Sequence, residues 1–342
     1  MVLRSIQAGR ALAAISVVVF HLSVLLSPDK SLLSRLSHHG NAGVDFFFVL
    51  SGFIIYYAHE RDIGHPDRLK RYLENRFLRV YPIYWVFTAA LVLVVLLAHT
   101  SSPIPSSPQG WISTVSLFRT STDPTPLNVA WTLFYEIAFY SLFALLILNR
   151  KAGALAFGLW ALVIVAFNHS TPTNSIWGVW TSRLCFNFLL GMAGCWAHRR
   201  IGVWAARAFI LLGGALLLAA GAYVDRGLGE LFGPLIAMAF ALLITGFAAL
   251  ERFKEINFGV LKPLGDASYT IYLAHVHVLA PVLRMFARVG LLMLVPADLL
   301  FVLVTALSLA VCYGLFMTVE RPLAKMLKSR VRPLALKAVE LR

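Results

Sequence analysis

Titratable side chains that lie inside apolar segments are the residues of this chain best suited to chemistry. Arg10 and His21 stand eleven residues apart in one such segment, and about three helical turns place them on one face, ~16 Å apart. A neutral imidazole in an apolar setting can still accept a proton, so His21 is a candidate general base. The alternative for this position is a histidine that only bonds a neighbouring backbone carbonyl.

Asp45 lies near the start of a second apolar segment, in the run Gly-Val-Asp-Phe-Phe-Phe over 43–48. Its carboxylate could orient a histidine or bind a hydroxyl group, but aspartate is also a favoured N-cap of a helix. Farther along, Ser51 and Gly52 are two small neighbouring residues, which favours close helix packing over catalysis.

Two arginines one helical turn apart, Arg76 and Arg79, precede the third apolar segment. A guanidinium group offers paired donors to a phosphate, so both residues are candidates for holding the phosphates of a cosubstrate. Basic residues beside a belt of aromatic residues, here Tyr81 and Trp85, also anchor a helix at a membrane surface. Both interpretations stay open from the sequence.

Glu136 and Arg183 are charged residues within the fourth and sixth apolar segments. A charge in such a place needs a partner or a task, because it is costly to bury. Glu136 could bind sugar hydroxyls, with Trp131 stacking on a pyranose ring. An ion pair between Glu136 and Arg183 is the structural alternative.

Ser268, Tyr272 and His275 follow an i, i+4, i+7 pattern in the ninth apolar segment. Residues with this spacing project from one face of a helix, so we expect all three to face the interior of a bundle. Asp266, two residues before Ser268, is expected to cap the start of this helix.

Some conspicuous residues favour structural roles. Glu320-Arg321-Pro322 closes the last apolar segment, where the proline is expected to end the helix. Cys185, Cys195 and Cys312 lie within apolar segments and lack the spacing of metal ligands, so we predict neither a metal site nor a disulfide framework.

The segments that carry these residues are long enough to cross a membrane. Of 342 residues, 59% are hydrophobic and 13% charged, with a mean hydropathy of +0.77, whereas soluble domains are about a quarter charged. The apolar blocks are about 17–25 residues long, as a membrane-crossing helix requires. They predict an all-α, polytopic transmembrane bundle of about ten spans, at 8–27, 42–60, 80–98, 129–148, 152–168, 177–198, 203–223, 231–250, 267–288 and 293–318.

The formal charge of +14 does not indicate a nucleic-acid partner, because the basic residues sit in short loops between apolar blocks. With both termini in the cytoplasm, 23 of the 30 lysines and arginines lie on the cytoplasmic side, as the positive-inside rule expects. The first block lacks a signal-peptide cleavage site and is expected to remain as a helix. We expect one membrane domain over 1–325 and a basic cytoplasmic tail over 326–342.

Taken in order, six of these segments resemble the acyltransferase-3 family of integral-membrane O-acyltransferases. The matching features are Arg-x10-His at 10–21, Gly-Val-Asp-Phe-Phe-Phe-Val-Leu-Ser-Gly-Phe at 43–53, Arg-Phe-Leu-Arg-Val-Tyr-Pro-Ile-Tyr-Trp at 76–85, Trp-Thr-Leu-Phe-Tyr-Glu at 131–136, the segment 264–275 and Glu-Arg-Pro at 320–322. The compact length is most similar to exopolysaccharide-production acetyltransferases of the ExoZ type. Where related proteins often have a glutamate in the sixth span, this chain has Asn187.

The resemblance implies a bacterial inner-membrane enzyme with acetyl-CoA or another acyl-CoA as cosubstrate, no tightly bound cofactor, and a glycan or lipid-linked sugar as acceptor. It implicates His21 as the catalytic residue and Arg10 as its essential neighbour; we add Asp45 as the group that orients His21. Arg76 and Arg79 would then bind the CoA phosphates. The acceptor would be bound by Trp131, Glu136, Arg183, Ser268, Tyr272 and His275. Polysaccharide-assembly machinery is an expected partner.

Two other classes of protein fit the same pattern. A proton-coupled transporter also carries Arg, Glu and His within its spans, but the inverted-repeat symmetry typical of transporters is not visible in this sequence. A scaffold for polysaccharide assembly would use the polar groups only to join helices. Transfer of labelled acetyl from acetyl-CoA by the purified protein would separate the three.

Overall fold

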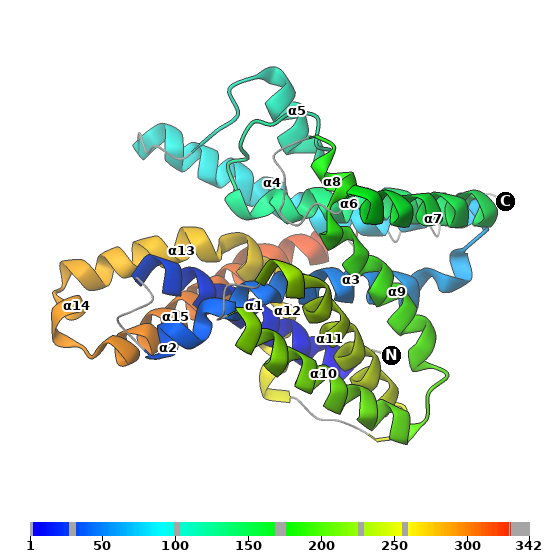
Figure 1. Cartoon of the computed structure of the whole chain (residues 1–342). Helices are drawn as coiled ribbons and strands as arrows, with labels where there is room; N and C mark the ends of the chain where they lie inside the picture. Colours follow the sequence, from blue (N-terminus) through cyan, green and yellow to red (C-terminus); the bar gives the residue numbers. More distant parts are fainter. Residues whose placement is uncertain are drawn as a thin grey trace.

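In the computed structural model every regular element among the described residues is a helix, as the apolar blocks predict (Figure 1). The structure describes residues 3–26, 32–98, 103–167, 176–224, 229–254, 259–327 and 329. Within these ranges, nine helical stretches are long and apolar enough to cross a membrane. The chain is therefore an all-α, multi-pass membrane protein. The expected basic tail over 326–342 lies outside the described residues, apart from 326, 327 and 329.

Nine of the ten predicted spans correspond to continuous helices. These are α1 (Arg4–Leu26), α3 (Gly43–His59), α4 (Leu69–Ala98), α6 (Trp131–Leu148), α7 (Arg150–Phe167), α10 (Val203–Val224), α11 (Gly229–Leu250), α13 (Ser268–Arg288) and α15 (Ala297–Leu315). Shorter helices lie between them: α2 (Leu32–Leu36), η2 (Ser37–Ala42), η3 (Glu60–Asp62), η4 (Pro66–Arg68), α5 (Pro108–Ser116), η5 (Asn128–Ala130), η7 (Gly259–Leu261), α12 (Lys262–Asp266) and α14 (Leu291–Leu294).

The sixth predicted span, 177–198, is a broken helix. It consists of α8 (Gly178–Thr181), η6 (Arg183–Cys185) and α9 (Phe186–His198). The break lies at Ser182, whose backbone is extended with ψ of 136° and whose hydroxyl accepts a hydrogen bond from the amide of Leu184. A serine that caps a new helical turn competes with continuation of the previous one, which explains the interruption.

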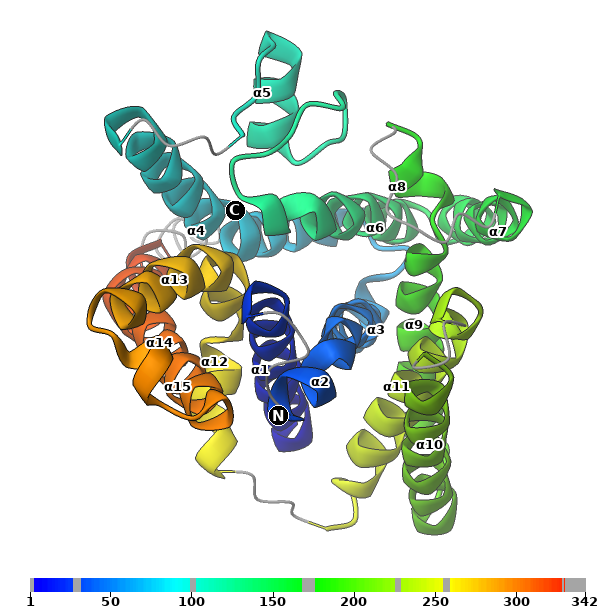
Figure 2. The same ribbon diagram turned by 60° about the vertical axis from the view of Figure 1, so that its left-hand side comes forward.

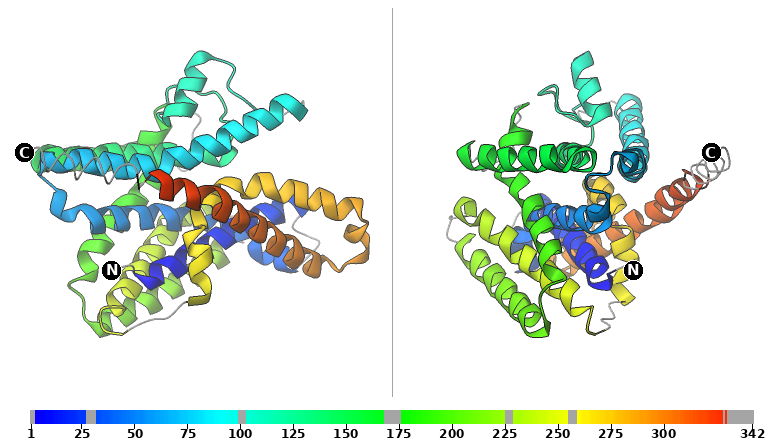
Figure 3. Two further views of the ribbon diagram at one scale, coloured as in Figure 1. Left: turned by 180° about the vertical axis from the view of Figure 1, so that it is seen from behind. Right: turned by 90° about the vertical axis from the view of Figure 1, so that its right-hand side faces the viewer.

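The helix α1 lies in the middle of the bundle and contacts α3, α11, α12, α13 and α15 (Figure 2). The helices α10 and α11 pack against each other on one flank, while α4, α6 and α7 form a layer across the top of Figures 1 and 3. Polar residues on α1 and α13 contact each other inside the protein.

Two glycines set the distance between α3 and α9. A Cβ atom on Gly52 would lie 2.0 Å from the carbonyl oxygen of Phe188, and one on Gly191 would lie 1.9 Å from that of Val49. Neither position has room for a side chain, so the two backbones approach as closely as small residues permit. This confirms the packing role predicted for Gly52.

The last helix does not end at Pro322 as predicted. After α15 a π-helical turn, η8 (Phe316–Glu320), leads into a further helical stretch over 321–327. A proline ring would clash with the carbonyl four residues earlier in a regular α-helix. The wider π turn just before Pro322 shifts that carbonyl, and the helix continues.

The start of α13 is also built differently from the prediction. Its N-cap is Ala267, which makes no side-chain capping bond. Asp266 instead ends α12, where its carboxylate accepts a hydrogen bond of 2.7 Å from the Lys262 ammonium one turn earlier. The capping role predicted for Asp266 is therefore wrong.

The polar segment between α4 and α6 folds around Asp123. Hydrogen bonds from the hydroxyl and backbone amide of Ser107 hold the pKa of the Asp123 carboxyl below its usual value. Ser107 is also the N-cap of α5, where it accepts from the amide of Gly110. The α5 helix is tied to α4 by the hydroxyl of Tyr84, which donates to the carbonyl of Thr114 over 2.9 Å.

Candidate active site

His21 from α1 and His275 from α13 meet inside the bundle. Nε2 of His275 lies 3.2 Å from Nδ1 of His21, and the ring centroids are 4.8 Å apart. Nδ1 of His21 also lies 2.9 Å from the carbonyl oxygen of Val17 on its own helix. His21 is half-buried and His275 is completely buried. His21 therefore contacts a backbone carbonyl, as a purely structural histidine would, and it also contacts a second titratable ring, that of His275.

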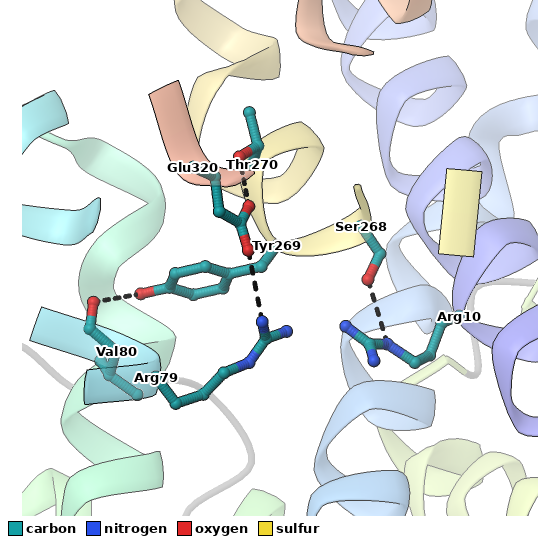
Figure 4. Close-up of polar contacts among 7 residues, drawn as sticks. All are labelled: Arg10, Arg79, Val80, Ser268, Tyr269, Thr270 and Glu320. Atoms are coloured by element: carbon teal, nitrogen blue, oxygen red, sulfur yellow. Dashed lines mark hydrogen bonds and ion pairs between the residues drawn. The ribbon is translucent and has the colours of Figure 1, made fainter. Parts of the chain in front are cut away.

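Arg10 reaches the same helix as His275. Its Nε donates to Oγ of Ser268 over 3.1 Å (Figure 4). Ser268 and His275 are both buried, and the hydroxyl of Tyr272 lies 2.7 Å from Oγ1 of Thr132 on α6. The predicted interior face of α13 is therefore confirmed, and α1 contributes both residues of the Arg-x10-His motif to it.

Asp45 lies with Asn187 rather than with His21. The Asn187 amide donates to Oδ1 of Asp45 over 2.8 Å. The helices α1 and α3 meet at Gly43, where an added Cβ would lie 2.6 Å from Oγ of Ser16. Asp45, two residues later, contacts α9 through Asn187. The contact through which Asp45 was expected to orient His21 is therefore replaced by one with Asn187. The capping alternative is also wrong, because the N-cap of α3 is Ala42.

A polar cavity of about 450 Å³ lies between α1, α3, α4, α6, α13 and the end of the last helix. Its wall combines cationic, acidic and phenolic groups: Arg10, Arg76, Arg79, Glu136, Glu320, Tyr140, Tyr269 and Tyr272. Tyr272 connects this cavity with the histidine pair, because its ring centroid lies 6.1 Å from that of His275. Two arginines predicted to bind phosphate therefore share a cavity with the arginine of the Arg-x10-His motif.

Glu320 is a site residue that the sequence analysis assigned to structure. It is buried, and its Oε1 accepts a hydrogen bond of 3.3 Å from Arg79 while its Oε2 accepts one from Thr270 (Figure 4). The Arg79 guanidinium also lies over the ring of Tyr269, 5.2 Å from the centroid. A carboxylate at the end of an apolar segment was the available signal, whereas Glu136 was singled out by lying within such a segment.

Arg76 also lines the cavity, and it makes fewer polar contacts than Arg79 does. Its guanidinium lies over the ring of Tyr140 at 5.8 Å. Its Nε is buried and has no hydrogen-bond partner among the described residues. The guanidinium makes no hydrogen bond or ion pair with the described residues, so its donors that line the cavity are suited to an anionic ligand.

Glu136 and Arg183 line different cavities. The Glu136 carboxylate accepts hydrogen bonds from the hydroxyls of Tyr140 and Ser51 and faces the polar cavity. Arg183 instead lines a larger, mainly apolar cavity of about 950 Å³ together with Asp45 and Asn187. The structure does not bring Glu136 and Arg183 together, so the ion pair considered from the sequence is not formed. Each residue belongs to a separate polar cluster.

Trp131 is not part of the polar cavity's lining. It is half-buried, and its ring meets that of Tyr135 edge-on at 5.9 Å. A neighbouring residue, Thr132, lines the cavity instead. A role for Trp131 in stacking on a sugar remains a prediction.

The described part of the chain contains no cluster of three or more His, Cys, Asp or Glu residues that could hold a metal ion. Cys185, Cys195 and Cys312 are free thiols, and all three are buried.

A family model described as an acyltransferase domain, acyltransferase-3, matches residues 3–317, nearly the whole chain. The chain belongs to the acyltransferase-3 family. This membership makes it a multi-pass membrane O-acyltransferase, and the transporter and scaffold alternatives fall away.

Two curated relatives are similar to this acyltransferase. The chain is 27% identical over 325 residues to the exopolysaccharide production protein ExoZ of Rhizobium meliloti, which covers 86% of this chain and 94% of that protein. It is 26% identical over 317 residues to the peptidoglycan O-acetyltransferase OatA of Listeria monocytogenes, covering 79% of this chain and 48% of the other. The chain thus spans about half the length of the Listeria protein. No solved structure matches the acyltransferase.

Proposed function

We propose that this acyltransferase transfers an acetyl group from acetyl-CoA to a hydroxyl of an exopolysaccharide or another cell-surface glycan, in the inner membrane of a bacterium. The observation that carries the proposal is a cavity lined by three arginines and by Tyr272, whose ring lies 6.1 Å from that of His275 in the His21–His275 pair. The names of the two relatives, one an exopolysaccharide production protein and one an O-acetyltransferase, support a glycan acceptor and an acetyl group.

The arginine-lined part of the cavity suits the phosphates of CoA. Arg10 donates to Ser268 and Arg79 to Glu320, whereas the Nε of Arg76 has no partner in the described residues. We therefore assign Arg76 the main phosphate contact and Arg79 a supporting one. The narrow pantetheine arm of CoA would then extend past Tyr272 toward the histidines.

His21 would act as the general base. Its imidazole takes the proton from the acceptor hydroxyl while the oxygen attacks the thioester carbonyl carbon. The carbon–sulfur bond then breaks, and the CoA thiolate leaves and recovers the proton from the imidazolium. A lipid-linked sugar or a growing chain in polysaccharide-assembly machinery would supply the hydroxyl, with Glu136 and Tyr272 among the groups that bind it.

The experiment is a transfer assay with the purified protein in lipid nanodiscs. We expect acetyl-labelled acetyl-CoA to place alkali-labile label on extracted polysaccharide, only when both the protein and the acceptor are present. Label that fails to reach any glycan fraction, from an exopolysaccharide producer or from a cell wall, would contradict the proposed acceptor class.

A further inference from the structure

We infer that His275 is a positioning residue that fixes the proton of His21 on Nδ1, so that Nε2 of His21 is the nitrogen that removes the acceptor proton. The inference rests on the proposed function and deepens it. It names the reacting atom and the group that selects this atom. The observation behind it is a set of four polar contacts around the two rings, three of them to backbone carbonyl oxygens.

The contacts of His275 define where its own proton lies. Its Nδ1 is 3.0 Å from the carbonyl oxygen of Ile271 and 2.8 Å from that of Tyr272. A carbonyl oxygen only accepts, so Nδ1 must carry the hydrogen. The completely buried ring is neutral, because a buried charge without a counter-charge is costly. Nε2 of His275 is consequently a hydrogen-bond acceptor.

The contacts of His21 then follow from those of His275. Nδ1 of His21 faces two acceptors, the carbonyl oxygen of Val17 at 2.9 Å and Nε2 of His275 at 3.2 Å. A hydrogen on Nδ1 satisfies both in a three-centre bond. With the hydrogen on Nε2 instead, three lone pairs would meet. The favoured tautomer of His21 therefore leaves Nε2 bare and able to accept a proton.

This arrangement also favours the charged state formed during the reaction. When Nε2 of His21 takes a proton, the bond from its Nδ1 to His275 becomes charge-assisted, and such bonds are roughly twice as strong as neutral ones. In a Ser-His-Asp triad a carboxylate holds the tautomer and stabilises the imidazolium. Here a neutral imidazole performs both tasks without placing a second charge in the bundle, and Asp45 is not needed for them.

The chain offers a matched control two residues along α13. His277 is half-buried, and its Nε2 has no hydrogen-bond partner among the described residues. Replacing either histidine by leucine removes one imidazole from the same helix. Only the change at position 275 removes the acceptor that faces His21.

The first test compares transfer rates of His275→Leu, His275→Gln and His277→Leu in nanodiscs. The amide oxygen of glutamine can accept from Nδ1 of His21, whereas leucine cannot. We expect His275→Leu to lower kcat at least about tenfold, since loss of the correct tautomer is severe in related catalytic arrangements, with the KM for acetyl-CoA unchanged. His275→Gln should recover part of the loss, and His277→Leu should match the parent. Equal loss in the leucine and glutamine variants at position 275, or parental kcat in both, would overturn the inference.

The second test needs no turnover. Nitrogen-15 spectra of histidine-labelled protein report which ring nitrogen carries hydrogen, and the His21 signals are assigned by their loss in His21→Gln. We expect Nδ1–H and a bare Nε2 for His21 in the parent. The opposite tautomer overturns the inference even if the enzyme is active. Absence of acetyl transfer by the parent protein overturns the proposed function instead.

Discussion

Arg79 and Glu320 form an ion pair of 3.3 Å that joins α4 to the end of the last helix at the wall of the polar cavity. The two side chains differ in exposure, with 40% of Arg79 and 9% of Glu320 accessible. Thr270 on α13 donates to the second oxygen of Glu320. The carboxylate therefore connects three elements that surround the cavity, and Arg79 has a structural contact as well as its proposed role in binding phosphate.

A double variant separates these two roles of Arg79. Arg79→Ala should lower the thermal unfolding midpoint in detergent, because it leaves one oxygen of buried Glu320 without its partner, at a cost of about 1–3 kcal/mol. Adding Glu320→Gln removes the unpaired charge and should restore much of the midpoint. The KM for acetyl-CoA of the double variant should still exceed that of Glu320→Gln alone. Equal KM values in these two variants would assign Arg79 to structure only.

Arg76 should matter more than Arg79 for the acyl donor. Hydrogen bonds to charged groups contribute about 1.5–3 kcal/mol, so Arg76→Ala should raise the KM for acetyl-CoA about tenfold or more. The matched control is Arg71→Ala, an exposed arginine on the same helix that is not part of the cavity's lining. Steady-state kinetics at saturating acceptor measure both. If the KM for acetyl-CoA of Arg76→Ala were as low as that of Arg71→Ala, Arg76 would have only a membrane-anchoring role.

The close approach of α3 and α9 predicts a large effect of one methyl group. Gly191→Ala would place a Cβ 1.9 Å from the carbonyl oxygen of Val49, and overpacking of this kind costs about 1–3 kcal/mol or more. Its unfolding midpoint should fall clearly below that of the parent. Gly214→Ala on α10, where nothing lies within 4 Å of the added atom, is the control and should not lower it. Similar midpoints for the two variants would show that α3 and α9 can separate.

The spans were the part of the fold best predicted from the sequence, because crossing a hydrocarbon core requires an apolar block of fixed length. The break at Ser182 was missed because the surrounding residues 177–198 are apolar enough to be taken for one helix. The continuation past Pro322 was missed for a related reason. A π turn that accommodates a proline leaves no composition signal.

The candidate site could be predicted only where its residues share one helix. Ser268, Tyr272 and His275 share a face because of their spacing, and that prediction is confirmed. Contacts between helices depend on how the helices cross, which spacing does not encode. For this reason spacing alone predicts neither the contact of His275 with His21 nor that of Asp45 with Asn187.

The orientation in the membrane remains a prediction from charge. A reporter that is active only outside the cytoplasm should work when inserted in the loop 99–128 and stay inactive when inserted in 61–68 or fused after residue 327. The reason is the excess of lysine and arginine on the side that holds 61–79. Immunoblots of each fusion control for abundance. A reporter that is active in 61–68 and inactive in 99–128 would show the opposite orientation, with the arginine cavity on the outer side.

The most direct measurement is the acetyl-transfer rate of His21→Gln in nanodiscs, at an abundance matched to the parent. Glutamine retains a similar volume and can bond the neighbouring polar groups, but it cannot serve as a base near neutral pH. Loss of a general base typically costs about 10²- to 10⁴-fold in rate. The proposed mechanism therefore predicts a fall in kcat of that size with an unchanged unfolding midpoint. A His21→Gln variant that keeps most of the parental rate would make His21 a packing residue and contradict the mechanism.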